Sequence, residues 1–186
     1  VVDEVYDQFL TLLQEKLHTY VMGDPMNPAF NIGPLARLDL RQKVHQQVEN
    51  SIKQGATLRK GGVIPEQQGW WYPITILEDV RPGMPAFDDE IFGPVLSVVR
   101  AKNDEHAVEL ASETRFGLGA AIFSANTANA KRIAVEDIEA GCVAINDFVR
   151  SDPRVPFGGI KDSGYGRELG KLGIHEIINS KSIVGA

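Results

Sequence analysis

The sequence predicts an α/β fold in which a predominantly parallel sheet lies between two layers of helices. From residue 95 onward, short apolar and β-branched runs alternate with amphipathic segments, and the connections between them are short. Parallel neighbouring strands need such a crossover through a helix, and crossovers of this kind are right-handed in nearly all proteins. The order strand, helix, strand, helix, strand therefore predicts a three-layer αβα arrangement.

The elements expected in the first half are a helix over 3–18, a loop over 23–34, a helix over 36–54 and strands over 56–59 and 71–77. Apolar residues recur every three or four positions in the first helix, and Asp3 is placed to cap it. Proline and glycine exclude regular helix from the loop. Val44, Val48 and Ile52 give the second helix one packed face.

The elements expected in the second half are a loop over 81–89, a strand over 95–99, a helix over 104–113, a strand over 119–123, a helix over 127–138, a strand over 142–145, a glycine-rich segment over 157–166, a short helix over 167–172 and a strand-like tail over 177–184. The run Val-Leu-Ser-Val-Val at 95–99 is expected to be buried. The tail alternates weakly, which suits an edge strand.

Composition and charge exclude several classes of protein. Of the 186 residues, 43% are hydrophobic and 24% charged, and a net charge of −6 without basic blocks argues against a nucleic-acid partner. No apolar run approaches the roughly 20 residues that cross a bilayer, and no leader opens the chain, so we expect a cytoplasmic protein. The single cysteine, Cys142, cannot form an internal disulfide, and no metal-ligand spacing is found.

The segment Glu90-Ile91-Phe92-Gly93-Pro94 has two interpretations. It suits an ordinary turn into a strand, with Glu90 solvated. The alternative is a ligand site in which Glu90 accepts hydrogen bonds from hydroxyl groups and Phe92 stacks on a planar ring. The residues alone leave both interpretations open.

The second conspicuous segment runs from Pro156 to Glu168 and contains four glycines. Their spacing is superficially that of a phosphate-binding loop. However, no strand leads directly into the segment and no Lys-Ser/Thr pair closes it, so neither nucleotide fingerprint is met. A structural glycine hinge explains the composition better.

Four motifs in order carry a resemblance to a known family. They are Glu-x-Phe-Gly-Pro from residue 90, Phe-Gly-Leu-Gly-Ala from 116, Gly-Cys-Val-Ala-Ile-Asn from 141 and Pro-Phe-Gly-Gly-Ile-Lys-x-Ser-Gly-x-Gly-Arg-Glu from 156. Together they resemble the NAD(P)-dependent aldehyde dehydrogenase superfamily. Residues 1–186 would then form the C-terminal part of its catalytic domain. The stretch 151–157 is similar to the succinate-semialdehyde dehydrogenase branch.

The resemblance implies roles for four residues. Glu90 would bind the nicotinamide ribose hydroxyls of NAD or NADP, and Phe92 would pack beside the nicotinamide ring. Ser151 would help to hold the distal carboxylate of succinic semialdehyde, and Phe157 would line the aldehyde tunnel. Two further side chains, Arg150 and Arg154, match carboxylate geometry but are also ordinary surface residues.

The resemblance also implies what lies outside this chain. The family's nucleophilic cysteine, its general-base glutamate and its cofactor-binding domain belong upstream, so we expect no catalytic residue and no activity in the chain by itself. Cys142 is expected to be a small core residue. The full-length enzyme would be a homo-oligomer in which the tail 177–184 pairs across a subunit interface.

Two alternatives remain open. The longer enzyme could act on another aldehyde, aliphatic or aromatic, instead of an acid-bearing one. The chain could also be a non-catalytic module that serves assembly through its tail.

Overall fold

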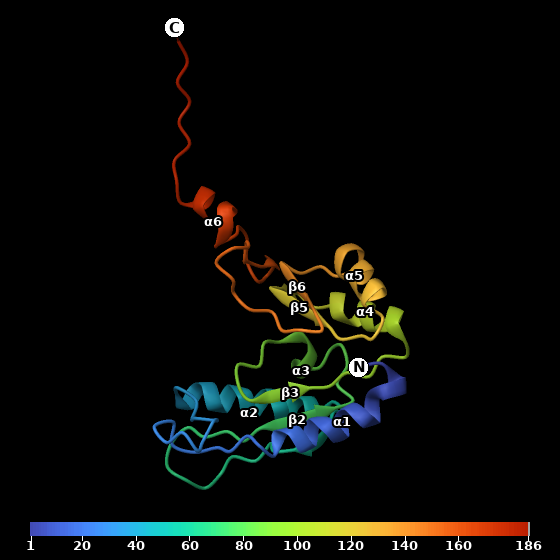
Figure 1. Ribbon diagram of the computed structural model, residues 1–186. Helices are drawn as coiled ribbons and strands as arrows, with labels where there is room; N and C mark the ends of the chain where they lie inside the picture. Colours follow the sequence, from blue (N-terminus) through green and yellow to red (C-terminus); the bar gives the residue numbers. More distant parts are fainter. Residues whose placement is uncertain (186) are drawn as a thin grey trace. The chain divides into compact units, whose positions relative to one another are not determined.

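The structure is a computed structural model that describes residues 1–185. The chain divides into two compact units, Val1–Ala107 and the residues from Val108 onward (Figure 1). The first unit contains α1 (Asp3–Leu17), α2 (Leu38–Lys53), β1 (Thr57–Lys60), β2 (Thr75–Glu78), α3 (Pro85–Asp88) and β3 (Val95–Ser97). Helix α4 (Asp104–Ser112) spans the boundary, and β4 (Phe116–Gly117), β5 (Gly119–Ile122), α5 (Thr127–Glu136), β6 (Cys142–Ile145), β7 (Ile160–Lys161) and α6 (Gly170–Glu176) follow.

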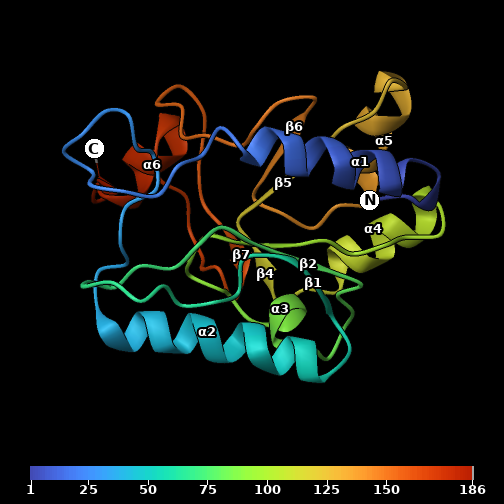
Figure 2. The same cartoon turned by 90° about the horizontal axis from the view of Figure 1, so that it is seen from below.

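The first unit is a three-layer αβα structure. Its sheet has the order β1-β2-β3, with β1 antiparallel and β3 parallel to the central strand. Successive side chains of β2 point to opposite faces, so Ile76 packs with Tyr6 and Leu10 of α1, whereas Leu77 packs with residues of α2. Figure 2 shows α1 and α2 on opposite sides of the strands. The predicted layering is therefore confirmed for this unit.

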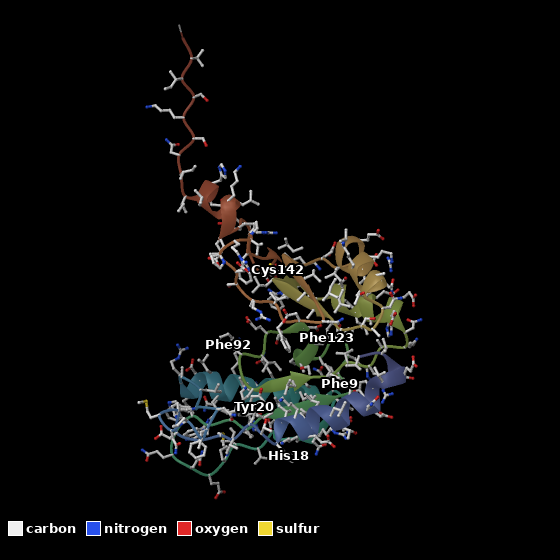
Figure 3. The ribbon with its side chains drawn as sticks, viewed as in Figure 1. Phe9, His18, Tyr20, Phe92, Phe123 and Cys142 are labelled. Carbon is white, nitrogen blue, oxygen red and sulfur yellow. The ribbon has the colours of Figure 1, made fainter. Side chains whose placement is uncertain are left out.

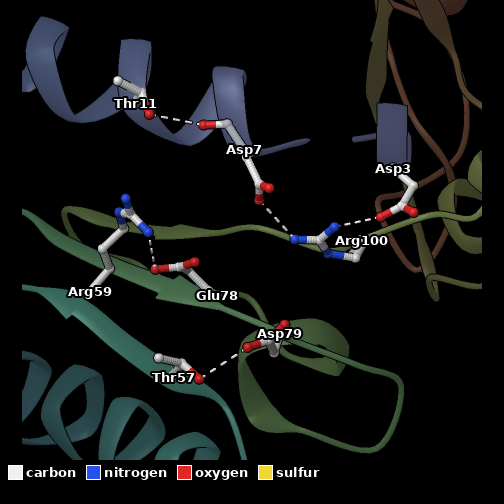
Figure 4. A network of polar contacts seen from close by, with 8 residues as sticks. All are labelled: Asp3, Asp7, Thr11, Thr57, Arg59, Glu78, Asp79 and Arg100. Carbon is white, nitrogen blue, oxygen red and sulfur yellow. Dashed lines mark hydrogen bonds and ion pairs between the residues drawn. The ribbon is translucent and has the colours of Figure 1, made fainter. Parts of the chain in front are cut away.

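Both long helices form where periodicity predicts them, but the expected cap of α1 is wrong. The N-cap position is Val2, which makes no side-chain cap hydrogen bond. The backbone N–H of Asp3 instead donates to Ala101 O at 2.7 Å, and its carboxylate pairs with Arg100 (Figure 4). The Asp3 carboxylate therefore forms an ion pair with Arg100, which is distant in sequence, instead of capping the helix.

The second unit contains a parallel pair of strands joined by a helix. Strands β5 and β6 pair in register from Gly119 with Cys142 to Ile122 with Ile145, and α5 connects them. Ala130 and Ile133 of α5 are buried. This strand, helix, strand unit confirms the parallel crossover predicted for 119–145, and the α/β class holds.

Several elements depart from the prediction. Strand β3 is shorter than expected and lies at the edge of its sheet, so Leu96 is 37% exposed and the expected burial is wrong there. Two antiparallel pairs, β1–β2 and β4–β7, were not predicted. Helix α3 forms within the expected loop 81–89, because Pro85 suits a first helical position.

The C-terminal part also differs. The short helix expected over 167–172 begins only at Gly170, since Leu169 has a positive φ of 63° and Glu168 is bridged to Phe157 in extended conformation. Residues 177–184, expected as an edge strand, form no strand within the described part of the chain.

Candidate functional site

Residues 89–94 form a turn between α3 and β3 that backbone hydrogen bonds hold at both ends. The Asp89 N–H donates to Pro85 O at 3.1 Å, which joins the turn to α3. The Thr75 N–H donates to Pro94 O at 2.9 Å, which joins it to β2. We refer to residues 89–94 as the Glu90 turn.

Side chains in the middle of the Glu90 turn alternate between the core and solvent. Ile91 packs against the hydrophobic cluster formed by α2, β2 and their neighbours. Glu90 is exposed, and Phe92 is 72% exposed (Figure 3). The turn therefore presents a carboxylate and an aromatic ring to solvent from a backbone that is fixed on both sides.

The exposed groups of the turn suit the ribose and ring of a nicotinamide cofactor. Within residues 1–185, Glu90 makes no side-chain hydrogen bond or ion pair, so both of its oxygens are available as acceptors for a diol. The ring of Phe92 offers an apolar face of the kind that stacks on a planar heterocycle. The residues present thus fit the group that the family resemblance implied.

In the second unit, Ser151 and Phe157 lie in one loop between β6 and β7. Ser151 is exposed and lies outside regular structure. Phe157 is half-buried, and two backbone hydrogen bonds with Glu168, of 2.7 and 2.8 Å, fix its position. The structure therefore brings these two residues into the same loop, with Phe157 the more firmly held.

Both arginines near Ser151 already have a carboxylate partner. Arg154 donates to Asp152 at 2.9 Å, and this guanidinium lowers the pKa of Asp152. Arg150 pairs with Asp147, whose pKa is lowered by the Phe148 N–H and then by Arg150. A substrate carboxylate at either arginine would have to compete with an aspartate of the chain itself.

In the glycine-rich segment, backbone carbonyl groups accept hydrogen bonds from an arginine of the same segment. Arg167 donates to Gly159 O at 2.9 Å and to Gly166 O at 2.6 Å. A Cβ added at Gly141 would lie 1.6 Å from Gly158 O, so these two backbones are in direct contact. A phosphate-binding loop needs free N–H groups, whereas here an arginine holds carbonyls together, which supports the structural interpretation.

Cys142 opens β6, where it is half-buried, and its Sγ lies 3.9 Å from Pro156 O (Figure 3). It does not belong to the buried core, so the expected core position is wrong, because β6 is only partly covered along its length. Within residues 1–185, no three His, Cys, Asp or Glu side chains gather in a way that could hold a metal ion. In the same range, no helix has both the length and the apolar character to cross a bilayer.

One residue beside the site was missed at the sequence level. Gln47 is 7% exposed and donates from Nε2 to Asp89 Oδ2 at 3.3 Å, directly beside Glu90. The available signal was its place on the helix: Gln47 shares a face with Val44 and Val48, where an apolar residue is expected.

Comparison with known proteins identifies the family. The model of the aldehyde dehydrogenase family matches residues 1–183. The chain is 46% identical to a succinate semialdehyde dehydrogenase [NAD(P)+] of Escherichia coli over 162 residues, which are 87% of this chain and 35% of that protein. It is 41% identical to a succinate-semialdehyde dehydrogenase [NADP(+)] of Mycobacterium avium over 180 residues, 97% of this chain and 38% of that protein.

A solved structure agrees. The succinic semialdehyde dehydrogenase of Streptococcus pyogenes, in complex with NADP+, superposes with a TM-score of 0.91 at 38% identity, covering 96% of this chain and 39% of that chain. The chain thus spans less than two-fifths of the length of these relatives. The family match, the identities and the shared fold lead to one conclusion: this chain belongs to the aldehyde dehydrogenase family.

Proposed function

We propose that this chain is the C-terminal part of the catalytic domain of an enzyme that oxidises succinic semialdehyde to succinic acid with NAD or NADP. Relatives at 41–46% identity carry the name succinate-semialdehyde dehydrogenase, which supports this substrate. The observation that carries the proposal is the Glu90 turn, which presents Glu90 and Phe92 outward from a backbone anchored at both ends.

In this proposal the Glu90 turn binds the nicotinamide half of the cofactor. The Glu90 carboxylate accepts hydrogen bonds from the ribose hydroxyls, and the Phe92 ring packs beside the nicotinamide. When bound, the cofactor supplies the hydride acceptor for the oxidation. The contribution of the turn is orientation, because its anchored backbone leaves few alternative positions for the two side chains.

The remaining chemistry belongs to other parts of the enzyme. The thiolate that attacks the aldehyde carbon and the carboxylate that activates water lie upstream in this family, so the chain by itself should not turn over. The Ser151 hydroxyl donates a hydrogen bond to the distal carboxylate of the substrate. Phe157, held by Glu168, forms part of the tunnel wall.

The experiment uses the full-length enzyme that contains this chain, with succinic semialdehyde or an uncharged aldehyde of similar length and with NAD or NADP. We expect cofactor reduction, with a higher kcat/KM for succinic semialdehyde than for the uncharged aldehyde. If neither NAD nor NADP is reduced, the proposed activity is contradicted. An equal kcat/KM for the two aldehydes would favour the other alternative, a dehydrogenase of a different substrate.

We also propose that the longer enzyme is a cytoplasmic homo-oligomer assembled through residues 177–184. Apolar side chains of this segment are exposed in the single chain, and Ile183 (88%) and Val184 (96%) are almost fully so. Exposed apolar residues on an extended segment favour a partner surface. Deleting 177–184 should lower the oligomeric state measured by sedimentation, and an unchanged state would contradict this role.

A further inference from the structure

Helix α2 presents one inward face to the segment that contains the Glu90 turn. The face consists of Val44, Gln47, Val48 and Ser51, which are the buried residues of this helix. Their spacing of three and four positions places them in one row along the helix. Three members of this row contact the segment from α3 to β3.

The segment runs antiparallel to α2, so successive contacts along the segment are made by residues progressively closer to the start of the helix. The Ala86 N–H donates to Ser51 Oγ at 2.9 Å. Gln47 Nε2 donates to Asp89 Oδ2 at 3.3 Å. At the far end Val44 lies against Gly93, where an added Cβ would come within 2.9 Å of Val44 Cγ2. The helix thus meets the segment at two positions before Glu90, one of them directly adjacent, and at one position after it.

Gln47 is the unusual member of the row. Its Oε1 is buried and has no hydrogen-bond partner within the described residues. A buried amide oxygen left without a partner destabilises a protein, so an apolar residue of similar size would suit the fold better. The hydrogen bond that Gln47 does make is to the carboxylate of Asp89. An ionised carboxylate only accepts hydrogen bonds, so the Nε2 group of the amide must face it.

Asp89 stands in a run of three carboxylates, Asp88, Asp89 and Glu90. Like charges on neighbouring side chains repel, and without a partner each of these three side chains would be free to turn away from the others. A donor fixed in the rigid face of α2 holds the middle carboxylate of the run against the helix. This leaves Glu90, the next residue, turned toward solvent.

We propose that Gln47 is a positioning residue for cofactor binding: through Asp89 it fixes the orientation of the Glu90 turn. This inference rests on the proposed function, in which Glu90 binds the nicotinamide ribose. Gln47 itself touches no substrate or cofactor. At the other end of the turn, Val44 packs against Gly93 beside the hydrogen bond from Thr75 to Pro94.

The test uses the full-length enzyme and the variant Gln47→Met, which keeps the length of the side chain and removes its amide. A structural role would predict lower stability, yet this variant removes a buried unpaired oxygen and should melt at the same temperature or higher. We expect the KM for the cofactor to rise about threefold to tenfold, the size of effect that loss of one ordinary hydrogen bond produces. The KM for the aldehyde should stay unchanged.

Three further variants complete the design. Gln46→Met is the matched control, because Gln46 is the exposed neighbour on α2 and makes no side-chain hydrogen bond within residues 1–185. Asp89→Ala should reproduce the effect of Gln47→Met, and the double variant should add nothing further, since both changes break the same contact. Glu90→Gln tests the proposed function directly.

The outcomes separate the two ideas. A cofactor KM that rises for Glu90→Gln but not for Gln47→Met overturns the positioning role and leaves the proposed function standing. Unchanged cofactor KM values for both variants overturn both. Additive effects of Gln47→Met and Asp89→Ala overturn the route through Asp89. If Gln47→Met raises the cofactor KM and also lowers the melting temperature, the positioning role is overturned, because reduced stability alone would then explain the weaker cofactor binding.

Discussion

The guanidinium of Arg100 lies over the ring of Tyr6, with 3.8 Å between Cζ and the ring centroid. The same guanidinium binds the carboxylates of Asp3 and Asp7, the latter at 3.0 Å (Figure 4). Tyr6 is buried beneath it in the cluster between α1 and the sheet. One side chain that follows β3 thus holds the first two turns of α1.

Replacing Arg100 should therefore loosen α1. Arg100→Lys keeps the positive charge but loses the planar guanidinium that pairs with two carboxylates and stacks on the ring. Arg100→Ala loses the charge as well as the guanidinium. We expect the thermal unfolding midpoint to fall in the order parent, Arg100→Lys, Arg100→Ala. Arg81→Ala is the control, because this arginine is exposed and its side chain makes no hydrogen bond or ion pair within residues 1–185. An equal midpoint for Arg100→Ala and the control would refute the contribution of this contact.

Two glycines with positive φ should respond differently to alanine. A Cβ at Gly61 (φ 75°) would lie 2.3 Å from Ile74 O, whereas at Gly83 (φ 91°) no atom lies within 4 Å. Gly83→Ala should lose about 1 kcal/mol of unfolding free energy through backbone strain alone. Gly61→Ala should lose at least about 2 kcal/mol more, because backbone atoms must move. Denaturant unfolding of both variants measures the difference, and equal losses would contradict the close approach at Gly61.

Alkaline pH should destabilise the first unit through Tyr72. Burial raises the pKa of this phenol to about 12 from 10.0, and burial also raises the pKa of Tyr6. A pKa raised in the folded state adds stability that is present below about pH 10 and lost as the pH rises toward 12. For Tyr72 the loss is about 2–3 kcal/mol. Tyr72→Phe removes this titration, so the parent should lose stability relative to the variant on going from pH 9 to about 12; a constant difference would contradict the assignment.

Substrate choice should depend on Ser151. In the full-length enzyme, Ser151→Ala removes a hydroxyl donor, and we expect the KM for succinic semialdehyde to rise about tenfold. An uncharged aldehyde of similar length has no distal carboxylate, so its KM should change little. Steady-state kinetics with both aldehydes gives the comparison. Equal changes in the two KM values would exclude a carboxylate-binding role for this serine.

The sequence predicted the elements whose pattern is long enough to be read. Fifteen residues of α1 and sixteen of α2 carry a clear apolar period, and both helices form within two residues of the expected limits. Helix α3 has four residues and β4 and β7 have two each, which is too short for any period. Their positions depend on contacts with distant parts of the chain, such as Ala86 with Ser51.

The exposure of the candidate site residues was predictable in part. Glu90 and Phe92 stood out because their motif combines a carboxylate, an aromatic ring and turn-forming residues, and the structure places both side chains outward. Gln47 did not stand out, since its partner Asp89 is 42 positions away and no local pattern links them. The ion pairs of Arg150 and Arg154 join residues only two or three positions apart, yet their side-chain orientations could not be read from spacing.

The most direct measurement is the dissociation constant of NAD or NADP for the full-length enzyme with Glu90→Gln, set against Asp88→Asn. Both changes remove one negative charge from the same run of carboxylates, but only Glu90 lies within the turn between its two anchors. We predict that Glu90→Gln weakens cofactor binding about tenfold and that Asp88→Asn leaves it unchanged. Equal binding by the two variants would contradict the assignment of the Glu90 turn as the cofactor site.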